Sequence, residues 1–325
     1  MKVLGTFLGV AFFASYAMAA PTVDGTRDAV YGSALAVQSV QTQFGDANPP
    51  GSLSGSELDA GYARIEGGRL YIMLTGNHEP NFNKLDVFID SVAGGENTLS
   101  ATPDYDFFNG SSWISSNMGG LTFDSGFAAD YHLLSRWGSG TGPYEVDFVN
   151  RSGGGSAMVP GSHAASPNAS GFIAVGSIAA GSVGPNASGS ALTQALDFAI
   201  NDNNNAGVLG GTGAANAANA AAVATGMEFS IALADLGNPA PGTDIKIAAM
   251  INNGDHNFLS NQVLGGLPAG TGNLGGDGAG GFTGSLGGVD FNNFTGNQYF
   301  SITVPEPASL ALLGLGGLVM LRRRR

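Results

Sequence analysis

Paired carboxylates are the residues of this sequence whose spacing comes closest to supporting acid–base chemistry. Asp104 and Asp106 are two residues apart, as are Glu145 and Asp147, and residues two apart on a β-strand share a face. Two carboxyl groups on one face are the arrangement that glycoside cleavage requires. Solvated acids on the outer face of a sheet give the same pattern, so the structural alternative stays open.

Other catalytic signatures are missing from the sequence. His78-Glu79 begins like a helical zinc-protease motif, but Pro80 breaks a helix and Phe82 stands where the second histidine is required. The chain has no cysteine, no Gly-x-Ser-x-Gly elbow and no phosphate-binding Gly-x-x-x-x-Gly-Lys loop. We therefore name no catalytic residue and expect a protein that is not an enzyme.

Calcium is the metal that the oxygen-rich turns favour, because Ca²⁺ prefers carboxylate, amide and backbone carbonyl ligands. The segment from Asp202 to Gly207 resembles an EF-hand loop only in part: Ala206 replaces a ligand, and Gly213 stands where the closing glutamate is needed. We predict a looser structural calcium site, with the candidate ligands Asp24, Asp28, Asp90 and Asp202.

Aromatic side chains near turns suggest a second kind of site. Trp113 and Trp137 are the only tryptophans, both lie close to glycine, and Tyr105 belongs to a nearby aromatic cluster. An exposed aromatic ring beside amide and carboxylate groups is a platform for a sugar ring. We name these three residues as candidate glycan ligands, with burial of both tryptophans in the core as the alternative.

Short strands must position these side chains. Residues 62–65 and 69–75 alternate apolar and polar around a Gly67-Gly68 turn, which predicts a hairpin, and residues 84–90, 227–233 and 245–251 alternate in the same way. Ala214 to Ala224 lacks an amphipathic stripe and is expected to be a loop with at most a helical turn. The sequence predicts an all-β antiparallel sandwich or jelly roll of about a dozen strands.

Both ends of the chain read as targeting segments. Lys2, the apolar run after it and the small residues Ala17 and Ala19 predict a helical signal peptide over 1–19, cut by signal peptidase. At the other end, Pro305-Glu306-Pro307 precedes an apolar stretch and the basic tail Arg322, Arg323, Arg324 and Arg325. The stretch from Ala308 to Leu321 is shorter than the ~20 residues of a comfortable span. We expect a short hydrophobic helix that contacts the membrane transiently.

The body between these signals, residues 20–304, is strongly acidic. Without the signals, 7 basic and 24 acidic residues remain, which gives a net charge of −17. Such a body repels nucleic acid and anionic membranes. With no cysteine, its stability must come from a hydrophobic core rather than from disulfides.

The C-terminal order of residues resembles the PEP-CTERM sorting domain of exported bacterial proteins. The resemblance covers residues 305–325 and implies recognition by an exosortase and removal of the tail. It further implies an inner-membrane intermediate, then delivery to the cell surface or extracellular polysaccharide matrix of a Gram-negative-type bacterium. A plain membrane anchor would explain the apolar and basic parts but not Pro305-Glu306-Pro307.

The body is similar to family-nine carbohydrate-binding and DOMON-like β-sandwich modules in three places. These are the opening Val23–Gly32, the pair Leu70–Asn77 and Leu85–Asp90, and Glu228–Gly237, although Tyr31 stands where such modules usually have tryptophan. The resemblance implies one β-sandwich and a polysaccharide partner. A secreted glycan-active enzyme and a calcium-dependent structural or adhesive protein are the alternatives.

Overall fold

The computed structural model describes residues 19–44, 55–102, 104–105, 114–154, 159–182, 192–204 and 206–306. The expected signal helix, the hydrophobic segment from Ala308 onward and the basic tail lie outside these residues. Within the described part, no helix is long and apolar enough to cross a membrane.

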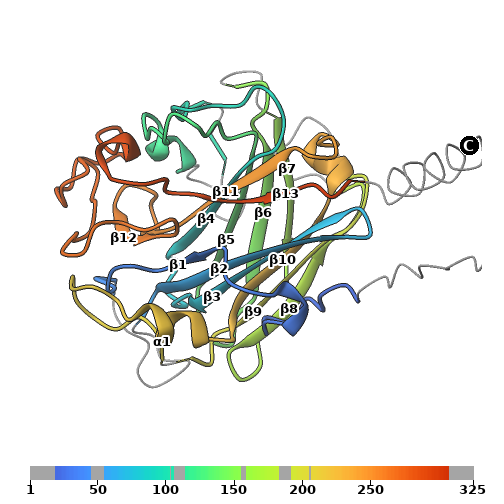
Figure 1. Ribbon diagram of the computed structural model, residues 1–325, viewed down its shortest axis with the longest axis horizontal. Coiled ribbons are helices and arrows are strands. Elements are labelled where there is room, and N and C mark those ends of the chain that lie inside the picture. Colours follow the sequence, from blue (N-terminus) through green and yellow to red (C-terminus); the bar gives the residue numbers. More distant parts are fainter. Residues whose placement is uncertain are drawn as a thin grey trace, which may run out of the picture.

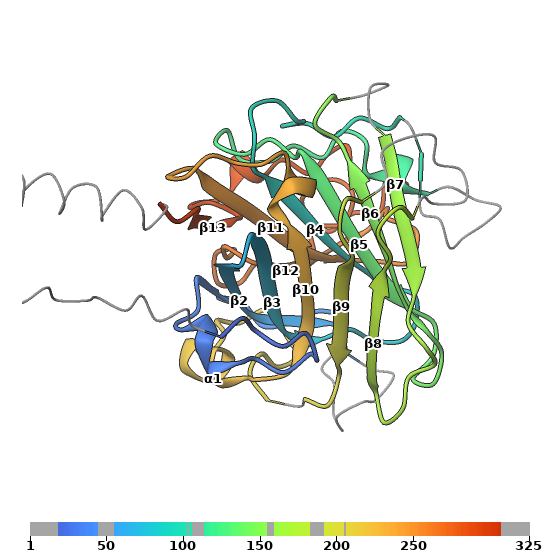
Figure 2. The ribbon, with the colours of Figure 1, turned by 90° about the vertical axis from the view of Figure 1, so that its right-hand side faces the viewer.

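Two antiparallel sheets form the body, as the sequence predicts (Figure 1). The six-stranded sheet has the order β1-β2-β3-β10-β9-β8, and the seven-stranded sheet has the order β12-β11-β4-β5-β6-β7, with β13 pairing β11. The strands of the first sheet are β1 (Ala36–Val37), β2 (Glu57–Glu66), β3 (Arg69–Asn77), β8 (Ile173–Ile178), β9 (Leu196–Asn201) and β10 (Gly226–Ala232). Those of the second are β4 (Lys84–Asp90), β5 (Tyr131–Trp137), β6 (Tyr144–Asn150), β7 (Val159–Ala165), β11 (Asp244–Asn252), β12 (Leu259–Val263) and β13 (Phe300–Thr303). Figure 2 shows β7 and β8 side by side where the two sheets meet.

The predicted hairpin is β2 and β3, paired from Glu57↔Asn77 to Glu66↔Arg69 around the tight turn at Gly67-Gly68. Both turn glycines have positive φ, 58° and 77°, which is the backbone that a two-residue type I′ turn demands. The alanine-rich stretch contains one short helix, α1 (Ala217–Ala222), and the side chain of Asn216 caps its N-terminus. This helix of 6 residues is longer than the single turn that the sequence predicts for the stretch.

The main core lies between the sheets. Leu70, Ile72 and Leu74 of β3 face Leu85, Val87 and Ile89 of β4, and each is fully buried. Period-two alternation places these six apolar side chains on inner faces, and their removal from water is the principal driving force for the sandwich.

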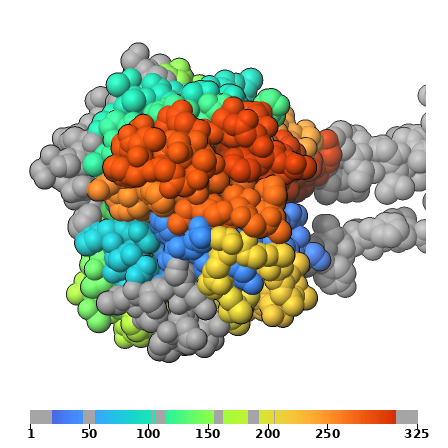
Figure 3. All heavy atoms as spheres, turned by 90° about the vertical axis from the view of Figure 1, so that its left-hand side faces the viewer, coloured from blue at the N-terminus to red at the C-terminus, as the bar shows by residue number. Residues whose placement is uncertain are grey.

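A second core covers the outer face of the seven-stranded sheet. Phe88 of β4, Val149 of β6 and Met250 of β11 are covered by apolar side chains from the connection after β4 and from the glycine-rich segment 264–298. In Figure 3 this glycine-rich segment, orange to red, lies beside the teal surface of the connection. Where this second core covers it, the seven-stranded sheet is buried on both faces, and outward-pointing polar side chains such as Asp86 and His132 are buried as well.

Candidate functional site at the C-terminal junction

The C-terminal segment leaves the body at β13, which pairs with β11 from Ile247↔Phe300 to Asp244↔Thr303. Val304 is still part of the body: it is 6% exposed, its N–H donates to the Thr243 carbonyl at 2.8 Å, and its carbonyl accepts from Gly242 N–H at 2.9 Å. Pro305 and Glu306 are exposed. The fold thus holds the chain up to Val304 and releases it at the first residue of the Pro-Glu-Pro motif. Pro307 and Arg322 to Arg325 lie outside the described residues.

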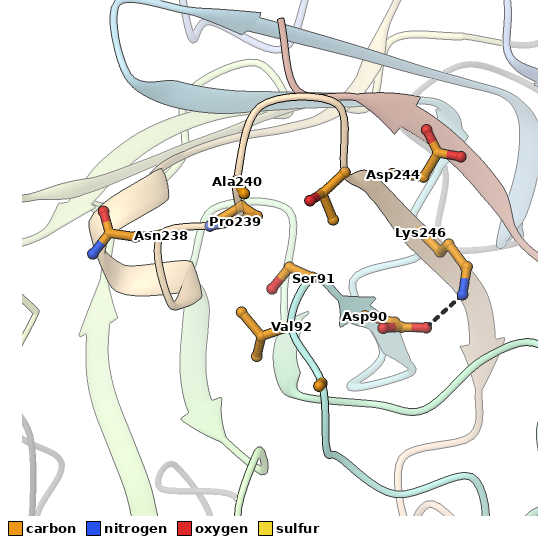
Figure 4. Close-up of a pocket in the computed structure, with 10 residues that line it drawn as sticks. Asp90, Ser91, Val92, Asn238, Pro239, Ala240, Asp244 and Lys246 are labelled. Atoms are coloured by element: carbon orange, nitrogen blue, oxygen red, sulfur yellow. Dashed lines mark hydrogen bonds and ion pairs between the residues drawn. The ribbon is translucent and has the colours of Figure 1, made fainter. Parts of the chain in front are cut away.

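A pocket of about 340 Å³ adjoins this junction (Figure 4). Asp90, Ser91 and Val92 line it from the end of β4, and the segment from Asn238 to Lys246 lines it from the start of β11. Asp244, on the pocket wall, accepts a hydrogen bond from the Thr303 hydroxyl at 2.5 Å. The wall of the pocket is therefore hydrogen-bonded to β13, the strand from which the sorting segment continues.

The predicted calcium ligand Asp90 lies in this pocket, but a protein cation already neutralises it. Its Oδ2 is 3.0 Å from Lys246 Nζ and accepts from Ala128 N–H at 3.2 Å. The ammonium group supplies the positive charge that a metal ion would bring.

The described N-terminal end lies on the same side of the body as the described C-terminal end (Figure 1). Ala19 and Ala20 are exposed, and the chain first becomes buried at Pro21. The predicted cleavage point after Ala19 is therefore exposed, while Ala17 lies outside the described residues. Both predicted processing signals attach to one side of the sandwich.

The entry turn after Ala20 is fastened by a distant glutamate. Glu228 Oε2 accepts from the backbone N–H groups of Asp24 and Gly25 at 3.0 and 3.1 Å, and Glu228 Oε1 accepts from the Tyr31 hydroxyl at 2.7 Å. Burial raises the pKa of Glu228 to about 7. We call these contacts of Glu228 with the entry turn and Tyr31 the clasp. The clasp joins two of the three segments that carry the resemblance to carbohydrate-binding modules, and it holds the entry turn against β10.

Asp24 and Asp28 cap turns of their own segment. Asp24 Oδ1 accepts from Thr26 N–H at 2.8 Å, and Asp28 Oδ2 accepts from Thr22 N–H at 2.7 Å. Asp202 is placed differently, because it is fully buried after β9 and burial raises its pKa to about 8. Over the residues that the structure describes, no three His, Cys, Asp or Glu side chains group closely enough to hold a metal ion.

The predicted aromatic platforms are core residues where they are described. Trp137 is 0% exposed, and its Nε1 donates to the His78 carbonyl at 2.8 Å. Tyr105 is also 0% exposed, and its hydroxyl lies 2.7 Å from His132 Nδ1. Neither ring face meets solvent, so neither offers a platform, because Trp137 packs in the main core and Tyr105 packs in the second core. Trp113 lies outside the described residues.

A chain of buried polar groups runs across the outer face of the seven-stranded sheet. Asp86 Oδ1 is 3.0 Å from His132 Nε2, His132 Nδ1 contacts Tyr105, and the Tyr105 hydroxyl accepts from Arg151 at 2.6 Å. Arg151 in turn pairs with Glu96. Sequence reasoning missed this chain, since its members come from segments between residues 86 and 151 and no local spacing links them.

Neighbouring charges set the ionisation of this chain. Burial by itself would raise the pKa of Asp86, but His256 and His132 beside it lower that pKa well below its usual range. Burial lowers the pKa of His132, and Phe88 stacks on its ring at 4.1 Å between centroids. The order carboxylate, imidazole, phenol can hold or relay a proton, but all three groups are fully buried.

The predicted carboxylate pair Glu145 and Asp147 does share a face, as the strand period requires. Arg136 joins them: its Nη1 is 2.7 Å from Asp147 Oδ2 and its Nε is 3.2 Å from Glu145 Oε2. Burial raises the pKa of Glu145 to about 7, whereas Arg136 and His163 outweigh burial and lower the pKa of Asp147 to about 2. Of the other predicted pair, Asp104 is described, and Asp106 lies outside the described residues.

Comparison with known proteins identifies the C-terminal segment. Residues 303–325 match the PEP-CTERM protein-sorting motif. Neither the curated proteins nor the solved structures include a match to the chain. The chain carries a PEP-CTERM sorting signal at the point where its β-sandwich ends, which marks it as an extracellular protein that is sorted by an exosortase.

Proposed function

We propose that this protein is a non-enzymatic component of the cell surface or extracellular matrix, whose β-sandwich body associates with extracellular polysaccharide. The observation that carries the proposal is the junction: the fold is complete at Val304, and the sorting motif begins at exposed Pro305. Cleavage of the tail by an exosortase would therefore release the body without disturbing a strand.

The use of the polar side chains supports a role without catalysis. Asp147 is engaged by Arg136, and Asp86 lies against two histidines. These groups are buried, and their charges hold neighbouring strands together. Acids that serve as structural ion pairs need no substrate to explain them.

The pocket beside the junction supports a hydroxylated partner. The carboxylate of Asp244 and the side chain of Thr243 lie on its wall, and such groups accept and donate hydrogen bonds to sugar hydroxyls. The acidic charge of the body disfavours nucleic acid as a partner. A neutral glycan fits both properties.

One observation favours a glycan-active enzyme as the second candidate. The pKa values of Glu145 and Asp147 lie on opposite sides of the usual carboxyl range, about 7 and about 2. Such divergence is characteristic of an acid–base pair in glycosidases. In this reading Glu145 is the acid and Asp147 the ionised partner.

Sorting is tested in a host that encodes an exosortase, by fractionation of cells that carry the wild-type chain or Glu306→Ala. Glu306 is exposed beyond the last strand, so the variant should fold normally but accumulate in the membrane fraction. The matched control is Asp255→Ala, an exposed acid elsewhere on the body, which should reach the surface. Surface delivery of Glu306→Ala equal to wild type, and unchanged by exosortase deletion, would contradict the sorting mechanism.

Polysaccharide association is tested by co-sedimentation of the exported protein with the matrix polysaccharide of its host. Ala93→Trp fills the pocket from an exposed position on its rim, and Ala179→Trp places the same side chain on the exposed turn after β8. We expect the first variant to lose retention and the second to keep it. Release of new reducing ends from the polysaccharide, abolished by Glu145→Gln, would instead establish the enzymatic candidate.

A further inference from the structure

The sorting motif follows the folded body without a spacer. Val304 is 6% exposed, and its backbone is hydrogen-bonded at both groups: its N–H donates to the Thr243 carbonyl, and its carbonyl accepts from Gly242 N–H. Pro305, the next residue, is exposed and is the first residue of the motif. The last residue that the fold holds and the first residue of the motif are therefore neighbours in the chain.

This lack of a spacer limits how far the motif extends from the body. Three residues reach at most ~10 Å from their point of attachment. An enzyme has to enclose the motif to recognise it, and even a domain of 100 residues has a radius of gyration of about 13 Å. An exosortase that takes up the motif therefore contacts the surface of the body next to Val304.

Strand β13 does not readily supply extra length. Its Phe300 is 4% exposed and packs in the main core, as does Val304. The Phe300 ring lies against Gly61 of β2, where a Cβ would be 2.7 Å from Phe300 Cε1. Detaching β13 would expose both apolar side chains to water and leave the edge of β11 from Asp244 to Ile247 unpaired. The body therefore stays folded up to Val304 while the motif is bound.

The glutamate of the motif lies against the body. A Cβ built on Gly242 would be 3.2 Å from Glu306 Oε1, so the Glu306 side chain lies beside the turn that precedes β11. Gly242 is exposed and has φ +82°, a backbone conformation that favours glycine. In the same turn, Thr243 N–H donates to the Ala240 carbonyl at 3.0 Å. An enzyme that contacts Glu306 therefore meets this turn as well.

The charge at the junction indicates the chemistry of the partner. Asp244 and Glu306 are both exposed carboxylates. Lys246, the cation of the same strand as Asp244, is already paired with Asp90 at 3.0 Å. An acidic surface favours positively charged or hydrogen-bond-donating groups on its partner and disfavours anionic lipid headgroups.

We infer that the exosortase docks on the exposed turn beside the motif. The docking surface, which we call the junction face, consists of Ala240, Pro241, Gly242 and Asp244. The enzyme reads the motif together with this face and presents positively charged or donor groups to Asp244 and Glu306. The inference rests on the proposed removal of the tail by an exosortase and goes beyond it, because a motif read only as a linear segment needs no contact with the body. It does not depend on association with polysaccharide.

The first test measures the rate of tail removal, by pulse–chase labelling of the full chain in a host that encodes an exosortase. Ala240→Trp adds bulk to the junction face, and Ala179→Trp, on the exposed turn after β8, is the matched control. We expect Ala240→Trp to lose tail removal and Ala179→Trp to keep the wild-type rate.

A second variant guards against misfolding of the first. Asp244→Asn keeps an acceptor for the Thr303 hydroxyl, so its melting temperature should equal that of wild type. The lost charge should slow tail removal about two- to fivefold. Wild-type rates of tail removal in both Asp244→Asn and Ala240→Trp would overturn the inference.

A spacer separates docking from mere proximity. About eight Gly and Ser residues inserted between Val304 and Pro305 let the motif extend ~27 Å further from the body. Because the enzyme then loses the junction face, the chain with the spacer should be processed more slowly than wild type, and Ala240→Trp should have no further effect in it. Processing of the spacer chain at the wild-type rate or faster would refute docking.

Cross-linking identifies the partner. The chain has no cysteine, so Ala240→Cys and Ala179→Cys each provide a single attachment point for a benzophenone. We expect cross-links to the exosortase from position 240 and none from position 179. Cross-links from position 240 to lipid alone would show that this face meets the membrane, which contradicts the inference.

Glu306→Ala distinguishes failure of docking from failure of sorting. Normal sorting of Glu306→Ala would refute the sorting mechanism and, with it, the docking. Blocked sorting of Glu306→Ala, together with wild-type processing of Ala240→Trp and of the spacer chain, would remove the docking and leave the sorting mechanism in place.

Discussion

The clasp between Tyr31 and Glu228 makes a prediction that depends on pH. Tyr31→Phe removes one hydroxyl and leaves Glu228 Oε1, which is buried, without the donor that lies 2.7 Å away. Because the pKa of Glu228 is raised to about 7, its carboxyl group is ionised at pH 8.5 and protonated at pH 5.5. The variant therefore loses a hydrogen bond to a charged carboxylate at the higher pH and a hydrogen bond to a neutral carboxyl group at the lower pH.

The magnitudes follow from the type of bond. A hydrogen bond to a charged group contributes roughly 1.5–3 kcal/mol and a neutral one roughly 1 kcal/mol. We expect Tyr31→Phe to lower the free energy of unfolding by about 2 kcal/mol at pH 8.5 and about 1 kcal/mol at pH 5.5. The first value corresponds to a fall in melting temperature of ~5 °C for a chain of this size. Urea and thermal unfolding followed by circular dichroism at both pH values measure the difference.

Tyr62→Phe is the matched control for this prediction. The Tyr62 ring packs near the Tyr31 ring, with 6.4 Å between their centroids, but the Tyr62 hydroxyl donates to the Ala221 carbonyl at 3.1 Å. That bond is neutral at both pH values, so its loss should cost about 1 kcal/mol at each. Equal costs for Tyr31→Phe at pH 5.5 and 8.5 would refute the ionisation that we assign to Glu228.

Three further predictions concern stability. Gly25→Ala places a Cβ 2.6 Å from the Asn201 backbone nitrogen at φ +79°, and it should lower the free energy of unfolding by about 3 kcal/mol or more. Gly67→Ala has φ +58° but meets no atom within 4 Å, so it should lower the free energy of unfolding by about 1 kcal/mol. Chemical denaturation of the two variants separates the effect of a steric clash from that of backbone strain. Arg136→Met leaves two buried carboxylates without their cation and should lower stability by about 3–5 kcal/mol, and a loss below 1 kcal/mol would contradict the buried pair. The free energy of unfolding should rise as the pH falls from 8.5 to 6.5, because acids with pKa values of about 7 or 8 bind protons more tightly in the folded state than in the unfolded state. These acids are Glu79, Glu145, Asp202 and Glu228. A free energy of unfolding that does not change between these pH values would contradict the raised pKa values.

One part of the candidate site, the sorting signal, could be predicted because its residues are contiguous in the sequence. The sorting signal is recognised as a run of residues, so Pro305 and Glu306 are identified without any knowledge of the fold. The pocket beside them could not be predicted, since it joins the end of β4 to the start of β11, more than 140 residues later in the chain. Only the antiparallel pairing of those strands brings the two walls together.

The sequence predicts a strand correctly where one face of the strand is apolar. The prediction fails where both faces carry polar as well as apolar side chains. The alternation of Leu85, Val87 and Ile89 identifies β4 directly. Strand β5, with His132 and Arg136 on its outer face, gives no such signal, and neither does the polar β12. These strands form because their partners and a second core bury them, which local periodicity does not report.

The sequence by itself determined the class of fold and the destination of the protein. Alternation with a period of two is a local property of a strand, and a sorting signal is a contiguous run of residues. Tertiary structure alone decided which polar groups are buried: Trp137 lies in the core, Glu228 binds the entry turn, and Glu57, Asp59 and Asn77 accept hydrogen bonds from the Asn204 side chain. Burial and ligation depend on residues that are far apart in sequence, and only the packing of the two sheets and their covering loops brings those residues within contact.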